Sequence, residues 1–141
     1  MKDRKIIKIG DSEKNKINIL ESNIVKFASI SGDFNPIHLD RSYAKTTIFK
    51  KRIAHGMYVG SLISSVIAEK MPGRGSIYLN QSFKFLKPVY IGDSVTVHVE
   101  FIEIVDRKKM KLKTICFNQK SDIVVEGEAL VLPPSNISIR E

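Results

Sequence analysis

A carboxylate and an imidazole lie five positions apart in the segment Asp33-Phe-Asn-Pro-Ile-His38. Pro36 fixes its own φ angle and disfavours a helical conformation of Asn35, so we expect a rigid turn that brings both side chains to one small volume. A histidine titrates near neutral pH, and a carboxylate beside it can hold the same water molecule. The pair therefore predicts acid–base chemistry on one water molecule, either its addition to an activated double bond or the reverse elimination.

These residues also have ordinary structural explanations. A glycine followed by Asp33 is typical of a helix end, Asn35-Pro36 is a common turn pair, and a lone histidine such as His38 is usually a hydrogen-bonded or surface residue. His98 falls in a strand-like segment, where a surface or cross-strand position is expected. No metal site is expected, because no two of the three histidines have the close spacing of metal ligands.

A second candidate segment, Ala54-His-Gly-Met57, comes directly before an apolar stretch. This stretch predicts a helix, and the N–H groups at a helix N-terminus favour negative charge. Gly56 has no side chain to keep a ligand away from its N–H group, so we expect this amide to stabilise an oxyanion on the substrate. His55 either orders the loop by hydrogen bonding, which is the interpretation that we favour, or contacts the substrate.

Three predicted helices position these segments. Ser22 is expected to cap the first helix, whose apolar residues lie largely on one side and which ends at Gly32, directly before Asp33. A short helix is expected at residues 40–45. The longest runs from Met57 to about Met71 and is apolar around most of its circumference, so we expect it in the centre of the fold.

The remaining segments are predicted to form strands. Residues 1–20 suit an extended lead-in or an edge strand, and four β-rich segments separated by turn signals follow the long helix. These segments span residues 76–90, 94–105, 109–119 and 123–132. Helices followed by antiparallel strands predict an α+β domain in which one sheet wraps the central helix. Because such a sheet leaves an edge strand exposed, a homodimer or higher homo-oligomer is expected.

Composition limits the class of protein. The 141 residues are 43% hydrophobic and 27% charged, which fits one globular domain over residues 1–141 and excludes a fibrous or disordered chain. The apolar stretch 57–68 is shorter than the roughly 20 residues of a membrane span, so no membrane association is expected. The N-terminus lacks the features of a signal peptide, and the single cysteine, Cys116, is expected to be a buried thiol. We therefore expect a cytoplasmic protein.

The chain is basic, with 23 Lys and Arg against 15 Asp and Glu and a net charge of +8. This charge attracts polyanions, and the candidates are nucleic acid, the phosphates of coenzyme A and an acidic carrier protein. Nucleic acid is not expected, because neither base-stacking aromatic clusters nor a basic helix are found. The basic run at residues 107–113 is interpreted as the solvated tip of a hairpin.

Three motifs lie between residues 27 and 93. They are Phe27-Ala-Ser-Ile-Ser-Gly-Asp-Phe-Asn-Pro-Ile-His38, Ala54-His-Gly-Met57 and Phe85-Leu-Lys-Pro-Val-Tyr-Ile-Gly-Asp93. The Gly-Asp-x-Asn-Pro-x-His element is a specific signature rather than a loose pattern. Over roughly residues 15–132 the chain resembles the MaoC-like family of (R)-specific enoyl-CoA hydratases. The resemblance implies a hot-dog fold, in which an antiparallel sheet wraps a long central helix, assembled at least as a dimer.

The resemblance also implies roles for individual residues. Asp33 and His38 match the catalytic pair that adds one water molecule to a trans-2-enoyl-CoA to give (R)-3-hydroxyacyl-CoA, or runs the reverse dehydration. Gly56 matches the oxyanion amide, and Asn35 matches the asparagine that orders the loop. The candidate substrate-binding residues are Asn35, His55, Met57 and Leu62. No cofactor is implied, because an acyl-CoA or acyl carrier protein thioester is itself the substrate.

Several alternatives stay open. The chain resembles (3R)-hydroxyacyl carrier protein dehydratases of fatty acid synthesis as well, and a thioesterase on the same fold would direct the activated water at the carbonyl. The Asp33 and His38 signature argues against a thioesterase. A binding module without catalysis would bind polyanions even after loss of His38. Acyl-chain length and the direction of the reaction stay open, and the candidate phosphate contacts are Lys84, Lys87 and Arg74.

Overall fold

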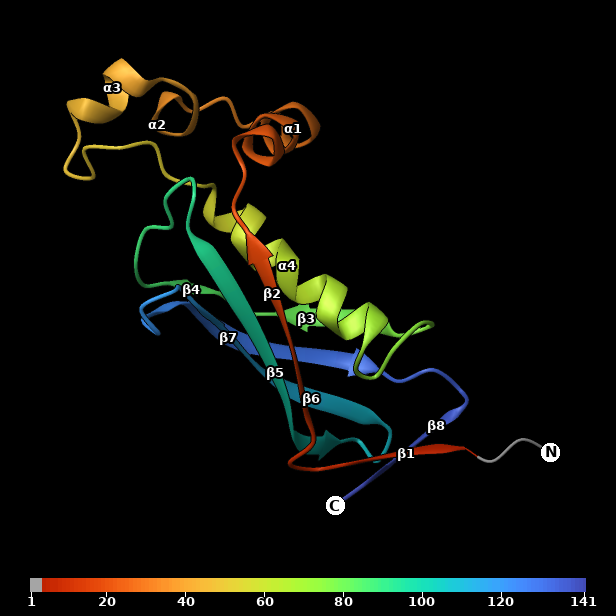
Figure 1. The fold of residues 1–141 in the computed structure, drawn as a ribbon. Coiled ribbons are helices and arrows are strands. Elements are labelled where there is room, and N and C mark those ends of the chain that lie inside the picture. The colour runs from red at the N-terminus through yellow and green to blue at the C-terminus, as the bar shows by residue number, and fades with distance from the viewer. Residues whose placement is uncertain (1–3) are drawn as a thin grey trace.

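The computed structural model describes residues 4–141. Residues 1–3 belong to the N-terminal segment for which no signal peptide is expected, and they lie outside the described residues. An antiparallel sheet packs one face against helix α4 (Gly56–Glu69), and three shorter helices lie beyond the N-terminal end of α4 (Figure 1). These are α1 (Glu21–Ser31), α2 (Pro36–Leu39) and α3 (Arg41–Lys45). The strands are β1 (Lys5–Lys8), β2 (Ser12–Asn18), β3 (Ile77–Gln81), β4 (Lys84–Phe85), β5 (Ser94–Val105), β6 (Lys109–Phe117), β7 (Ile123–Leu132) and β8 (Ile137–Arg140).

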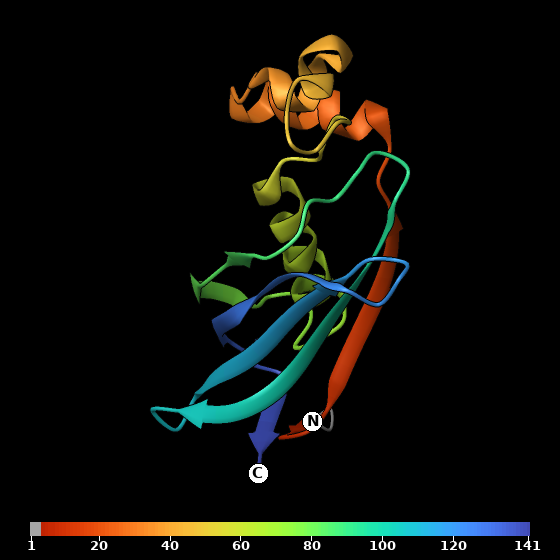
Figure 2. The ribbon, with the colours of Figure 1, turned by 90° about the vertical axis from the view of Figure 1, so that its left-hand side faces the viewer.

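The larger sheet has the strand order β2-β5-β6-β7-β3, and β4 also pairs with β7. Every pair in it is antiparallel, and the sheet curves around α4, as Figure 2 shows from the side. The predicted arrangement, a sheet wrapped around a long central helix, is confirmed. The predicted strand at residues 76–90 is two short strands, β3 and β4, which pair with β7 on either side of residues 82–83. A register shift between Tyr78 and Asn80 also makes the pairing within β3 irregular.

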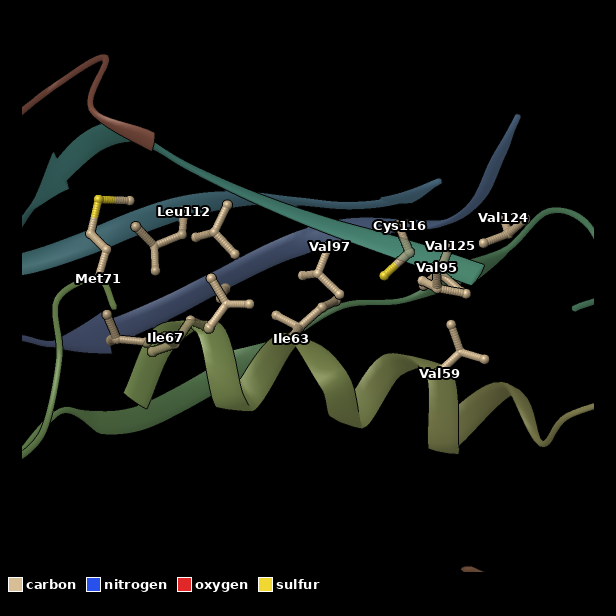
Figure 3. Close-up of a cluster of buried hydrophobic side chains, with 14 of the residues drawn as sticks. Val59, Ile63, Ile67, Met71, Val95, Val97, Leu112, Cys116, Val124 and Val125 are labelled. Carbon is tan, nitrogen blue, oxygen red and sulfur yellow. The ribbon is translucent and has the colours of Figure 1, made fainter. Parts of the chain in front are cut away.

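The core lies between α4 and the sheet. Val59, Ile63 and Ile67 point from one side of α4 toward the inner face of the sheet (Figure 3). On β5 the predicted alternation holds, since Val95, Val97, Val99 and Phe101 are all fully buried. Each such side chain contributes about 1.5–3 kcal/mol through removal of its apolar surface from water. Apolar contact therefore fixes how α4 lies on the sheet.

Cys116 is part of this core. The residue is fully buried on β6, and burial raises the pKa of its thiol to about 12. A thiolate is the reactive form of cysteine, so the prediction of a buried, unreactive thiol agrees with the structure.

The first helix differs from its prediction at its start and on its apolar side. Leu20 occupies the N-cap position and no side chain caps the helix, so the prediction of a Ser22 cap is wrong. Backbone pairing of Ile19 with Asp93, at 2.8 Å, ends the preceding extended segment and sets where α1 begins. Ile30 was expected on the buried side of this helix, but its side chain is 86% exposed. The predicted end is confirmed, because Gly32 adopts the left-handed conformation at φ 80°.

Helix α4 is buried on one side rather than around its circumference. Its buried residues are Val59, Gly60, Ile63, Val66 and Ile67. Met57, Ser61, Ser64 and Ser65 are exposed on the described chain. The side away from the sheet is thus open in the single protomer.

Strand β8 has no counterpart in the sequence-based expectations. It pairs in parallel with β1, with Ile7 beside Ile139 in the register. The two strands come from opposite ends of the chain, and a four-residue segment carries too little periodicity to be identified by itself. Within residues 4–141, no helix has the length and apolarity needed to cross a membrane.

We expect Ile63→Ala to lower the free energy of unfolding by about 2–5 kcal/mol, because it leaves a cavity between α4 and the sheet. Ile63 has no exposed surface. Urea denaturation followed by circular dichroism measures the change. Ser64→Ala, on the exposed side of the same helix, is the control and should change the value by less than about 0.5 kcal/mol. Equal effects of the two substitutions would contradict this packing.

Candidate active site

A pocket of about 450 Å³ lies between α2, the N-terminus of α4 and the segment that follows β4. Its lining is mostly apolar, with a small number of polar groups. The sequence-predicted residues that line it are Asp33, His38, His55, Gly56 and Met57. Asn35 and Leu62 do not line it. A largely apolar pocket with a few converging polar groups is the usual form of a small-molecule site.

The loop that carries Asp33 is held by a chain of local hydrogen bonds. The Asp33 N–H donates to the Ser31 hydroxyl at 3.1 Å, and the Asn35 N–H donates to the Asp33 carboxylate at 3.1 Å. Asn35 in turn accepts from the Ile37 N–H at 3.3 Å and caps α2. The prediction of a turn is wrong from Pro36 onward, where the segment is a helix, since proline is favoured at the first helical position.

His38 lies on α2 and is 8% exposed. Its Nδ1 lies 2.7 Å from the backbone carbonyl of Ile53. A carbonyl can only accept, so Nδ1 carries the proton and a neutral ring has its lone pair on Nε2. Burial, the largest cause, lowers the pKa of His38 below the ordinary 6.5, and the nearby His55 lowers it further. The ring is therefore a neutral base at physiological pH.

His55 is 1% exposed and lies against His38, with ring centroids 3.8 Å apart. Its Nε2 donates to the backbone carbonyl of Asp33 at 3.0 Å. The ring of Phe27 packs on it at a centroid distance of 4.9 Å. Among the described residues, nothing hydrogen-bonds to its Nδ1. These contacts support the structural interpretation of His55, because it ties the Asp33 loop to the start of α4.

Asp33, His38 and His55 each place one possible ligand atom within 4.8 Å of the others. The sequence spacing of the histidines gave no sign of this cluster, because folding brings His38 and His55 side by side from separate segments. Two of the ring nitrogens already bond to backbone carbonyls. A metal ion would need the same carboxylate and free imidazole nitrogen that acid–base chemistry uses.

Gly56 is the first residue of α4, and His55 is its N-cap. Among residues 4–141, no backbone carbonyl accepts the N–H group of Gly56 or Met57. These amides lie at the positive end of the helix dipole, where they stabilise negative charge. A Cβ atom at position 56 would lie 2.8 Å from the Phe85 ring, so the glycine is also required for packing. A Cβ atom at position 60 would likewise lie 2.7 Å from the Phe83 ring.

Several pocket residues were not predicted as site residues. The missed apolar lining comprises Phe49, Ile53, Ala54, Val59, Phe85, Leu86, Pro88, Val89 and Val125. The motif that begins at Phe85 could have identified part of this lining from the sequence, since Phe85 and the four residues after it line the pocket. Of the candidate phosphate contacts, Lys87 lines the pocket and lies 3.4 Å from Asp122, whereas Lys84 and Arg74 lie elsewhere.

One apolar pocket thus contains a carboxylate, a neutral imidazole and a backbone amide. The Asp33 carboxylate and the free His38 nitrogen can hold and deprotonate a water molecule. The Gly56 amide can stabilise negative charge that forms on a substrate oxygen.

Comparison with known proteins adds independent findings. Residues 7–121 match the family described as MaoC like domain. The chain is 46% identical over 130 residues to an (R)-specific enoyl-CoA hydratase of Rhodospirillum rubrum, covering 92% of this chain and 90% of that one. It is 43% identical to a 3-hydroxybutyryl-CoA dehydratase of Methylorubrum extorquens, covering 91% and 82%.

A solved structure shows the same fold. The (R)-hydratase of Aeromonas caviae involved in PHA biosynthesis superimposes with a TM-score of 0.88 at 40% identity, covering 91% of this chain and 98% of that one. The predicted hot-dog fold is confirmed. Because the family match and the relatives each extend over most of its length, the chain belongs to the MaoC-like family.

Proposed function

We propose that this protein is a hydro-lyase that adds water to a trans-2-enoyl-CoA to give (R)-3-hydroxyacyl-CoA, and that it also catalyses the reverse dehydration. The observation that supports this most is the convergence of Asp33, His38 and the Gly56 amide in one apolar pocket. Relatives at 40–46% identity named as (R)-specific hydratases support the same reaction.

In the proposed mechanism, Asp33 and His38 hold one water molecule. The Nε2 atom of His38 takes a proton from it as its oxygen bonds to the β-carbon of the substrate. The electron pair of the double bond moves toward the thioester, and the Gly56 N–H stabilises the charge on the thioester oxygen. The proton then passes to the α-carbon. Because water and proton come from one side of the pocket, addition is expected on one face of the double bond.

The other site residues have supporting roles in this proposal. Asn35 holds the Asp33 loop and the start of α2. His55 positions Asp33 through its carbonyl and His38 through ring contact. Met57, which lines the pocket, contacts the acyl chain. Leu62 lies outside the lining of this pocket. It would limit the length of the acyl chain only if the chain extends past the pocket.

The first test follows enoyl absorbance and released thiol on adding crotonyl-CoA. We expect wild-type protein to lose absorbance without releasing thiol. His38→Ala and Asp33→Asn should each lower kcat by several powers of ten, and the double variant should lose little more, since the two groups act on one water molecule. His98→Ala is the matched control, because His98 lies on β5 opposite Ile115 and should not affect the rate.

Other outcomes of this assay point to other functions. Thiol release would assign a thioesterase. Activity restricted to crotonyl carrier protein would assign a carrier protein dehydratase. Additive losses in the double variant, or an equal loss in His98→Ala, would contradict the acid–base pair.

The pH dependence tests the state of His38. Because burial lowers the pKa of His38 below 6.5, the ring stays neutral down to lower pH than an exposed histidine would. The acid limb of kcat/KM for hydration should therefore lie below pH 6.5. Asp33 raises the pKa of His38, so the limb of the residual Asp33→Asn activity should move to still lower pH. NMR titration of the His38 ring checks the assignment, and a limb above pH 6.5 would contradict it.

The homodimer and the cytoplasmic location both stay predictions. One edge of the sheet supports the homodimer. Strand β3 lies at one end of the strand order, and its Ile77, Tyr78 and Leu79 are 56%, 39% and 43% exposed. The opposite edge strand, β2, is instead rich in charged and polar residues. An uncharged apolar edge is favourable for pairing with a second chain.

Sedimentation velocity should therefore show wild-type protein at twice the mass of one chain. Ile77→Lys places a charge on the β3 edge and should shift the protein toward the monomer. Ile48→Lys is the control, since Ile48 is 88% exposed on a loop after α3. A wild-type monomer, or dissociation by both substitutions, would argue against pairing through β3.

A further inference from the structure

A second hollow lies beside the active-site pocket, on the far side of the segment that joins α3 to α4. Its volume is about 350 Å³. Five of its lining residues are cationic: Arg41, Lys45, Lys50, Lys51 and Arg52. The rest of the lining is Glu21, Tyr90 and Ile91. The mechanism proposed above uses none of these residues.

The positive charge of this hollow is largely uncompensated. Arg52 pairs with Glu21 at 2.7 Å. The other four cationic side chains form no salt bridge with any residue in the range 4–141. Like charges gathered around one concave surface repel one another and raise the local concentration of anions. The hollow is therefore complementary to a ligand with several negative charges.

Hydrogen-bonded backbone carries these cations. Arg41 and Lys45 are four residues apart on α3, so they lie on the same side of the helix. Lys50 has a positive φ of 64°, and its N–H donates to the Thr47 carbonyl at 3.2 Å. Arg52 also reaches the Leu39 carbonyl at 3.4 Å. The cations thus come from two adjacent segments with a fixed path.

One short segment separates the hollow from the active site. Phe49 and Ile53 line the active-site pocket, whereas Lys50, Lys51 and Arg52 between them line the hollow. An isolated β-bridge joins Ile53 to Tyr90, and the Tyr90 hydroxyl donates to the Phe49 carbonyl at 3.3 Å. A ligand whose reactive end and polyanionic end are joined by a flexible arm can occupy both cavities across this wall.

We propose that this basic hollow binds the 3′-phosphate and diphosphate of coenzyme A while the thioester lies at Asp33 and His38. The proposal rests on the proposed function. Several phosphate groups on one small molecule match several unpaired cations around a concave site, and Tyr90 and Ile91 provide a surface for the adenine ring. A carrier protein would bring one phosphodiester, and its folded surface requires a broad contact area rather than a small hollow.

The test compares a double variant with a matched control. Lys45→Ala/Lys51→Ala removes two exposed cations that hydrogen-bond to no described residue. Arg107→Ala/Lys108→Ala removes the same charge from the exposed turn between β5 and β6, which Figure 2 shows at the opposite end of β5 from residues 90–93. Adenosine 3′,5′-bisphosphate, which has no thioester, is the binding probe in calorimetry.

We expect the hollow variant to weaken bisphosphate binding about tenfold and the control to leave it unchanged. With crotonyl-CoA, the hollow variant should raise KM by a similar factor and leave kcat unchanged. With crotonyl-pantetheine, which has no phosphate, both variants should match wild type. The difference between variants should shrink at high salt, because exposed charges are screened.

The following results would overturn the proposal. They are equal bisphosphate affinity in wild type and the hollow variant, an equal loss in the control, and an equal rise in KM for crotonyl-pantetheine. A KM effect confined to crotonyl carrier protein would also overturn it, in favour of a protein partner. Bisphosphate binding without any hydratase activity would instead reject the proposed reaction and retain the hollow as a nucleotide phosphate site.

Discussion

The hydrogen bond from the His55 ring to the backbone carbonyl of Asp33 joins two segments that lie 22 residues apart. A second bond, from His38 to the Ile53 carbonyl, joins the same two segments. Together they place the carboxylate loop and α2 over the N-terminus of α4. The site depends on this connection, because a carboxylate, an imidazole and an amide act on one substrate only when all three face the same volume.

Packing of α4 on the sheet is what makes the connection possible. The buried side of the helix fixes its axis, and glycines at positions 56 and 60 allow the Phe85 and Phe83 rings to approach its backbone. The pocket wall and the amide thus come from the same contact. Any larger residue at position 56 would move the Phe85 ring and the helix N-terminus apart, so packing and chemistry share one constraint there.

Charge is distributed in two adjoining environments. In the apolar pocket, burial keeps His38 neutral, which suits proton transfer. Across the 49–53 segment, the cations around the second hollow remain in contact with solvent and largely without acidic partners. A thioester substrate has a matching division, with an uncharged reactive end and an anionic carrier.

The sequence by itself determined the elements that depend on local signals. The long helix, the left-handed end at Gly32, the strands at residues 94–105 and 123–132, and the spacing of Asp33 and His38 all follow from periodicity, glycine and proline. Tertiary structure alone decided which distant residues meet. The stacking of His55 on His38, the approach of Phe85 to Gly56 and the pairing of β1 with β8 join segments whose contact leaves no local pattern. For the same reason, the sequence did not predict that Ile30 and the side of α4 away from the sheet are exposed. Hydrophobicity shows which residues can be buried, but not which residues lie opposite them.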